Sequence, residues 1–96
     1  MNIELVARDV VVNEDVRVRV EQKLGKTLER SNKEIPVRMM VENTRGGYLA
    51  QVTMHVSGKE IIAQADQKNM LQAIDEALEK ADRQFKKHHD KRVSHR

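Results

Sequence analysis

The strongest constraint on the fold is an apolar stripe in the C-terminal third of the chain. Seven residues recur every three or four positions: Met70, Ala73, Ile74, Ala77, Leu78, Ala81 and Phe85. An α-helix has about 3.6 residues per turn, so this spacing places all of them on one side of a helix. Asn69 precedes the stripe as a preferred N-cap residue, and Gln72 three positions later matches the capping-box pattern. We therefore predict an amphipathic helix that starts near Asn69 and buries one face.

A second amphipathic helix is predicted in the first third of the chain. Its apolar residues lie four positions apart and form one stripe: Val16, Val20, Leu24 and Leu28. Asn13 precedes them as an N-cap residue, and Glu14 and Asp15 fall in the first turn, where the helix dipole favours anions. Val18 does not fit the stripe and is expected on the solvent side.

Four segments alternate between apolar and polar residues, which is the pattern of half-buried β-strands. They are residues 2–7, 37–42, 48–57 and 60–65. Between the second and third segments lies Asn43–Gly47, whose paired glycines are typical of a tight turn, and Gly58–Lys59 is expected to begin another. The last three strands are therefore predicted to be antiparallel neighbours joined by hairpins.

This order of elements predicts an α+β fold, β-α-β-β-β-α, with two helices packed on one face of a four-stranded sheet. The 96 residues suffice for a single domain, 1–96, with one modest core. The chain has no cysteine and no apolar run near the ~18 residues of a membrane helix, so we expect a soluble, cytoplasmic protein without membrane contact. The sequence leaves open whether the basic end from about residue 91 is ordered.

Positive charge is concentrated at the C-terminal end. Residues 80–96 contain seven of the 18 Lys and Arg residues and two of the 15 Asp and Glu residues, so the remainder is slightly acidic. At ~100° per residue, an arc of about 80° beside the apolar stripe holds Lys80, Arg83, Lys87 and Lys91. On the first helix an arc of about 60° holds Arg19, Lys23, Lys26 and Arg30. Two such flanks on neighbouring helices are expected to present one cationic surface to a polyanion such as RNA or DNA.

A plainer interpretation of these charges stays open. Cations near a helix end complement the helix dipole, and the acidic residues Glu21 and Glu29 lie among the cations of the first helix as ordinary surface pairs. Binding by stacked aromatic platforms is disfavoured, because the chain has one Phe, one Tyr and no Trp.

Metal binding and catalysis are not expected. His88, His89 and His95 lie among Lys and Arg residues that repel a cation, and adjacent histidines on a helix point about 100° apart. The helical carboxylates Asp75, Glu76 and Glu79 are interpreted as solvated charges, since no apolar pocket is evident that would raise their pKa for acid-base work. We expect no cofactor, no metal and no enzymatic activity.

Several segments together resemble one known family. They are Met1-Asn2-Ile3, the helix start Asn13 to Arg17, the strand Ala50 to Val56 with Gly58 after it, and Asn69-Met70-Leu71-Gln72-Ala73-Ile74-Asp75 followed by basic residues. The chain is similar over essentially its whole length to the ribosome hibernation promoting factors, the protein Y or ribosome-associated inhibitor family. Leu71 and Asn69 depart from residues common in the family, but neither change touches the basic surface. The length resembles the short form of the family, although a piece of a longer protein would look the same.

The resemblance implies a fold similar to double-stranded RNA-binding domains and a function in translation inhibition. It implies binding to the small ribosomal subunit and its RNA, obstruction of the messenger and transfer RNA sites, and inactive ribosome dimers formed with a second, dimer-promoting protein under stress or in stationary phase. We expect the free protein to be a monomer. By position in the family, the RNA contacts would be Lys23, Lys26, Arg30, Lys80, Arg83, Lys86, Lys87 and Lys91.

Two other functions remain as alternatives at this point. The first is a protein-interaction module that modulates a transcription factor, with the basic surface meeting an acidic partner. The second is a small RNA-processing enzyme, for which the residues provide no catalytic arrangement.

Overall fold

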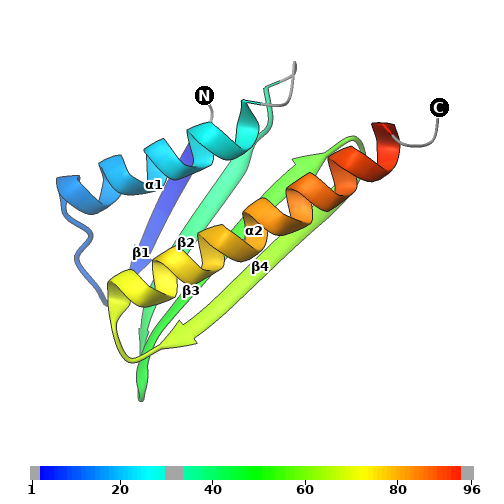
Figure 1. The fold of residues 1–96 in the computed structure, drawn as a ribbon. Coiled ribbons are helices and arrows are strands. Elements are labelled where there is room, and N and C mark those ends of the chain that lie inside the picture. Colours follow the sequence, from blue (N-terminus) through cyan, green and yellow to red (C-terminus); the bar gives the residue numbers. More distant parts are fainter. Residues whose placement is uncertain (1–2, 30–33, 94–96) are drawn as a thin grey trace.

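The computed structural model describes residues 3–29 and 34–93, with side chains as far as residue 88. Six elements follow one another along the chain: β1 (Ile3–Arg8), α1 (Glu14–Leu28), β2 (Val37–Thr44), β3 (Gly47–Val56), β4 (Lys59–Gln67) and α2 (Met70–Val93). The strands form one sheet in the order β1-β2-β3-β4, and both helices lie on the same side of it (Figure 1). The predicted fold class is confirmed.

The sheet is mixed. β1 runs parallel to β2, and the other neighbouring strands are antiparallel. A parallel pair needs a crossover connection between its strands, and α1 provides it. The consequence is that α1 lies over the β1 side of the sheet and α2 over the β4 side, with the two helices next to each other (Figure 1).

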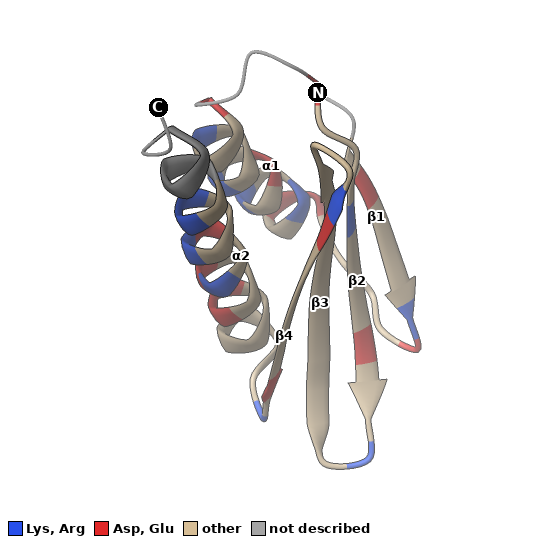
Figure 2. Cartoon of the chain, turned by 90° about the vertical axis from the view of Figure 1, so that its right-hand side faces the viewer, with Lys and Arg blue, Asp and Glu red and all other residues tan. Residues whose placement is uncertain are grey.

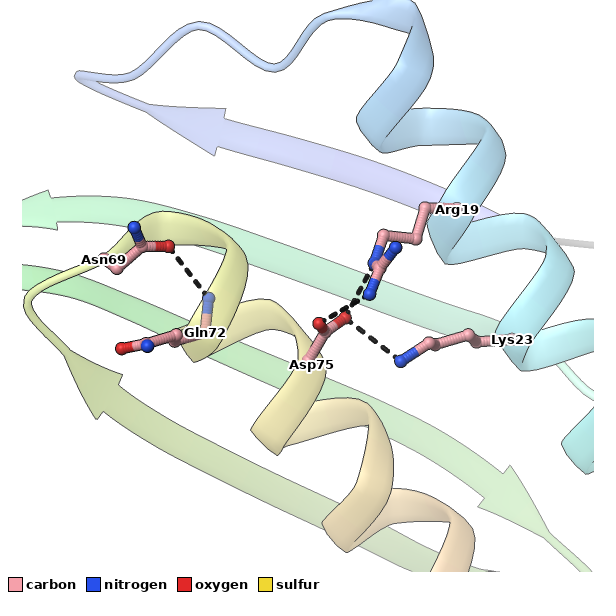
Figure 3. Close-up of polar contacts among 5 residues, drawn as sticks. All are labelled: Arg19, Lys23, Asn69, Gln72 and Asp75. Atoms are coloured by element: carbon pink, nitrogen blue, oxygen red, sulfur yellow. Dashed lines mark hydrogen bonds and ion pairs between the residues drawn. The ribbon is translucent and has the colours of Figure 1, made fainter.

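Both helices start where their cap residues predict. The Asn13 side-chain oxygen accepts a hydrogen bond from the Val16 backbone N–H at 3.0 Å. Asn69 accepts one from the Gln72 backbone N–H at 3.1 Å (Figure 3). Each bond satisfies a donor that the first helical turn leaves without a backbone partner, so both asparagines are confirmed as N-caps.

The first hairpin is tighter than predicted, and the second is shifted by one residue. Thr44 pairs with Gly47, so the first loop contains two residues, and the strands extend into the segment predicted as a turn. Position 47 requires glycine, because a β-carbon there would collide with the backbone carbonyl oxygen of Gln67. The second turn consists of Ser57 and Gly58, with φ values of 51° and 77°, whereas Lys59 already belongs to β4. Two positive φ values are the signature of a type I′ hairpin, which matches the twist of the strands.

The core lies between the helices and the sheet. Its largest fully buried side chains include Phe85 and Ile74 of α2, Leu24 of α1, and Met39 and Met54 of the central strands. The opposite face of the sheet is open and carries polar groups, for example Gln51 and Gln64, which hydrogen bond at 3.1 Å. Val18 is 42% exposed, as its place off the stripe predicts.

The C-terminal part of α2 carries the basic end considered above. The helix runs to Val93, so residue 91 has a helical backbone. Residues 94–96 lie outside the described residues. Among the described parts of the chain, no helix is long and apolar enough to cross a membrane.

Candidate nucleic-acid interface

The predicted RNA-contact residues lie in three different environments. On α1, Lys23 lies on the flank that faces α2, and Lys26 lines the groove between the helices. On α2, Lys86 points to Asp82 of its own helix, at 3.1 Å. A third group, on the outer side of α2, contains Lys80, Arg83 and Lys87. Arg30 and the side chain of Lys91 lie outside the described residues.

Asp75 joins the two helices. Its carboxylate accepts hydrogen bonds from Arg19 Nε at 2.9 Å, from Arg19 Nη2 at 2.8 Å and from Lys23 Nζ at 3.1 Å (Figure 3). The Arg19 guanidinium, and after it Lys23, hold the pKa of the Asp75 carboxyl below its usual value, against the opposing effect of partial burial. The expectation that Asp75 is a solvated charge was therefore wrong, because the side chain links α1 to α2.

A second polar contact between the helices involves a buried hydroxyl. Thr27 of α1 is 7% exposed, and its Oγ1 donates to Asp82 Oδ1 at 2.7 Å. Asp82 also pairs with Lys86 one turn along α2. Around these side chains runs a groove of about 230 Å³, lined by Lys23, Lys26, Thr27, Leu78, Glu79 and Asp82. The groove therefore contains charges of both signs.

Lys80 lies on the other flank of α2, toward the edge strand β4. Its Nζ donates to the backbone oxygen of Gln64 at 2.9 Å and lies 3.5 Å from Glu76 Oε2. Gln84, one turn further, donates to the backbone oxygen of Ile62 at 3.2 Å. Both carbonyls belong to β4, so these α2 side chains occupy backbone acceptors that an edge strand otherwise presents to another chain.

Among the side chains that the structure describes, carboxylates lie between the two basic arcs. The carboxylates of Asp75, Glu79 and Asp82 recur every three or four residues along the side of α2 that faces α1. Figure 2 shows Lys and Arg segments interspersed with Asp and Glu segments along α2. In this part of the molecule the carboxylates, with Lys86 paired to one of them, separate the α1 cations from the outer α2 cations.

The described residues form two further hollows, the first of which shares Lys23 and Lys26 with the interhelical groove. The first, of about 460 Å³, is lined by Arg19, Gln22, Lys23 and Lys26 of α1. The second, of about 510 Å³, lies on the open face of the sheet, where Arg38 contacts Glu4 at 3.0 Å and His55 lies 3.6 Å from Glu60. The first hollow has cations and an amide as its lining, so it suits an anion. The second has mixed charge and lies on the sheet face opposite the helices.

Three residues at this site were not predicted, namely Asp75, Asp82 and Thr27. Hydrophobic periodicity identifies the buried side of each helix, but it does not say which polar flanks of two helices will meet. One signal did exist for Asp75, because it ends the segment that carries the family resemblance. Within the side chains that the structure describes, no group of three or more His, Cys, Asp or Glu residues is arranged to hold a metal ion.

Comparison with known proteins identifies relatives over nearly the whole chain. Residues 3–93 match the family model described as Sigma 54 modulation protein / S30EA ribosomal protein. A protein of Escherichia coli named ribosome hibernation promoting factor is 30% identical over 95 residues, covering 99% of this chain and 100% of that protein. A protein of the same name from Azotobacter vinelandii is 28% identical, covering 97% and 87%.

The fold also matches solved structures. The crystal structure of the Thermus thermophilus Protein Y N-terminal domain superposes with a TM-score of 0.82 at 22% identity, covering 92% of this chain and 99% of that one. A ribosomal subunit interface protein from Coxiella burnetii gives a TM-score of 0.81 at 21% identity, covering 94% and 99%. The family description and the names of these relatives refer to modulation, ribosome hibernation and a ribosomal subunit interface, which agrees with the expected non-enzymatic function.

Proposed function

Because this chain belongs to the Sigma 54 modulation protein / S30EA ribosomal protein family, we propose that it is a ribosome hibernation factor. The observation that carries the proposal is the match with the Escherichia coli ribosome hibernation promoting factor, which spans 99% of this chain and all of that protein. The name of the Coxiella burnetii structure, a ribosomal subunit interface protein, supports the same partner. A ribosome as partner places the protein in the cytoplasm.

The exposed cations of the helices supply the chemistry for binding ribosomal RNA. Arg83 and Lys87 are exposed on the outer side of α2, and Lys80 lies beside them. Phosphate contacts of this kind are electrostatic and carry no sequence information by themselves, so the shape of the RNA surface selects the site. Bound at the small subunit, the protein obstructs the messenger and transfer RNA sites and inhibits translation by occupancy. It also favours inactive ribosome dimers, together with a second protein.

The test is cosedimentation with purified small subunits and with whole ribosomes. Charge reversal at Lys80, Arg83 and Lys87 should abolish cosedimentation, because three phosphate attractions become repulsions. The matched control reverses Arg8, Lys59 and Lys68, which are exposed and belong to the sheet and its connections, so the net charge changes equally. Normal cosedimentation of the α2 variant would refute the site, and loss of binding in both variants would show that only total charge matters.

Ribosome pairing is scored in the same gradients. Addition of the protein and of a dimer-promoting partner to ribosomes should increase the dimer fraction, whereas the α2 variant should leave it unchanged. If the protein inhibits translation but leaves the dimer fraction unchanged, the proposal is limited to translation inhibition.

The family description also names modulation of a transcription factor, so one alternative has a specific basis. In that function, the basic surface binds an acidic protein partner. A pull-down from nuclease-treated lysate separates the two functions: retention of one protein together with loss of ribosomal components would favour the alternative.

A further inference from the structure

The contact between Asp75 and α1 engages only part of the hydrogen-bonding capacity of the two cations. A guanidinium has five N–H donors and an ammonium has three. Asp75 accepts from Arg19 through Nε and Nη2, and from Lys23 through one bond. The donors on Arg19 Nη1 are not used by this carboxylate. Side chains of Arg19 and Lys23 are 46% and 39% exposed, so remaining donors can reach a ligand.

These cations line a concave surface rather than a flat one. The hollow of about 460 Å³ on α1 is formed by Arg19, Gln22, Lys23 and Lys26, which add up to three positive charges and one amide. Asp75 reaches the cluster from α2, and its own side chain is less exposed, at 28%. The carboxylate holds Arg19 and Lys23 from the second helix (Figure 3), whereas the side chains that line the hollow all belong to α1.

From this arrangement we infer that Asp75 is a positioning residue for an anion subsite on α1, which takes a phosphate of the RNA backbone. The inference rests on the proposed ribosomal function and adds two residues, Arg19 and Asp75, that the family resemblance does not assign. Arg19 contacts the phosphate, and Asp75 acts through Arg19 and Lys23. Long, flexible side chains lose rotamer freedom when they bind, so cations that are already held in place bind an anion at a smaller entropic cost.

A purely electrostatic role of Asp75 predicts the opposite change in RNA affinity when Asp75 is neutralised. If Asp75 only adds a negative charge near the phosphates, its neutralisation should tighten RNA binding, as the removal of any neighbouring carboxylate would. If Asp75 positions Arg19 and Lys23, its neutralisation should weaken binding. Glu79 provides the matched comparison, because it is an exposed carboxylate one turn along the same side of α2.

The experiment measures affinity for purified small ribosomal subunits at one fixed salt concentration. We expect Asp75→Asn to weaken binding by about three- to tenfold, since two side chains must then be ordered on binding. Glu79→Gln should bind as tightly as the unmodified protein or more tightly. Arg19→Lys keeps the charge but loses the two-pronged contact, so it should weaken binding in the same direction as Asp75→Asn. Equal or tighter binding by Asp75→Asn overturns the inference.

A second measurement separates this inference from the proposed function and from loss of fold. Hydrogen exchange of the Arg19 Nε–H, followed by NMR in the free protein, should be slow in the unmodified chain and fast in Asp75→Asn. Failure of the unmodified protein to bind subunits would refute the proposed function. Equal exchange rates of the Arg19 Nε–H in the unmodified protein and in Asp75→Asn would refute the positioning contact. Thermal unfolding identifies variants that do not fold. If Asp75→Asn does not fold, the affinity of Arg19→Lys is used to test the inference instead.

Discussion

Arg19 and Lys23 of α1 bind a carboxylate on the neighbouring helix, whereas Lys80 and Lys86 of α2 find partners on their own helix or on the adjacent strand. Arg19 and Lys23 share Asp75 of α2. Lys80 instead contacts Glu76 within α2 and a carbonyl of β4, and Lys86 contacts Asp82. The α1 cations are therefore part of the contact between the helices. For this reason, changes at Arg19 and Lys23 affect packing and binding together, while changes at the exposed Arg83 and Lys87 of α2 report mainly on binding.

The difference between the helices concerns their polar flanks, because both are attached to the sheet through the same apolar core. Phe85 of α2 and Leu24 of α1 are each 1% exposed. Phe85→Ala should lower the free energy of unfolding by roughly 3–5 kcal/mol and Leu24→Ala by roughly 2–5 kcal/mol, since each leaves a cavity. Urea unfolding measures both. Val18→Ala is the control and should change the free energy by less than about 0.5 kcal/mol.

A small effect of Leu24→Ala would contradict the view that both helices are attached to the sheet by the apolar core. If Leu24→Ala cost less than about 1 kcal/mol, α1 would be held to the protein mainly by its polar contacts with α2. The ion pair at Asp75 would then be the principal attachment of α1 rather than an addition to the packing of its apolar side chains.

The Asp75 contact itself should contribute a smaller and pH-dependent amount. Its partners are partly exposed, so Asp75→Asn should lower the free energy of unfolding by about 1 kcal/mol at pH 7. The folded protein holds the pKa of Asp75 below its usual value, mainly through the hydrogen bonds from Arg19. A lowered pKa stabilises the folded state above the unfolded-state pKa of about 3.9, and this stabilisation is lost as the pH falls through the folded-state pKa.

Unfolding of both proteins between pH 7 and pH 2 measures this effect. The difference in unfolding free energy between the unmodified chain and Asp75→Asn should be constant near neutral pH and should disappear in acid. Glu79→Gln removes an equal charge from the same side of α2 and should leave the stability almost unchanged. A difference that persists undiminished at pH 2 would mean that the asparagine variant is destabilised by something other than the charged pair.

The sequence predicted the fold because hydrophobic period encodes burial directly. The stripe from Met70 to Phe85 could lie only on one side of a helix, and the alternation in residues 48–57 could place only Ala50, Val52, Met54 and Val56 inward. The caps Asn13 and Asn69 were predictable for a similar reason, since a short polar side chain before an apolar stripe satisfies the first backbone donors.

The sequence was a poorer guide to contacts that depend on where the elements meet. Arg19 and Asp75 are 56 positions apart, and no periodicity relates them. The role of Gly47 depends on the carbonyl of Gln67, which approaches it from the end of another strand. The second hairpin was misplaced by one residue, because Ser57 adopts a positive φ that glycine or asparagine takes more readily. Each of these features follows from tertiary structure.

The smallest expected effects distinguish Lys80 from Lys87 on the outer side of α2. Each substitution by Gln should reduce the dependence of log affinity for small subunits on log salt by about 0.7–0.9, the contribution of one phosphate contact. Lys80 donates to the Gln64 carbonyl of β4, so Lys80→Gln should also cost about 0.5–1 kcal/mol of unfolding free energy. Lys87→Gln changes an exposed side chain and should cost less than about 0.5 kcal/mol. Salt titrations of binding and urea unfolding on the same two variants measure both quantities. Equal stabilities would mean that the Lys80 contact with the strand contributes nothing, and an unchanged salt slope for Lys87→Gln would remove that residue from the RNA surface.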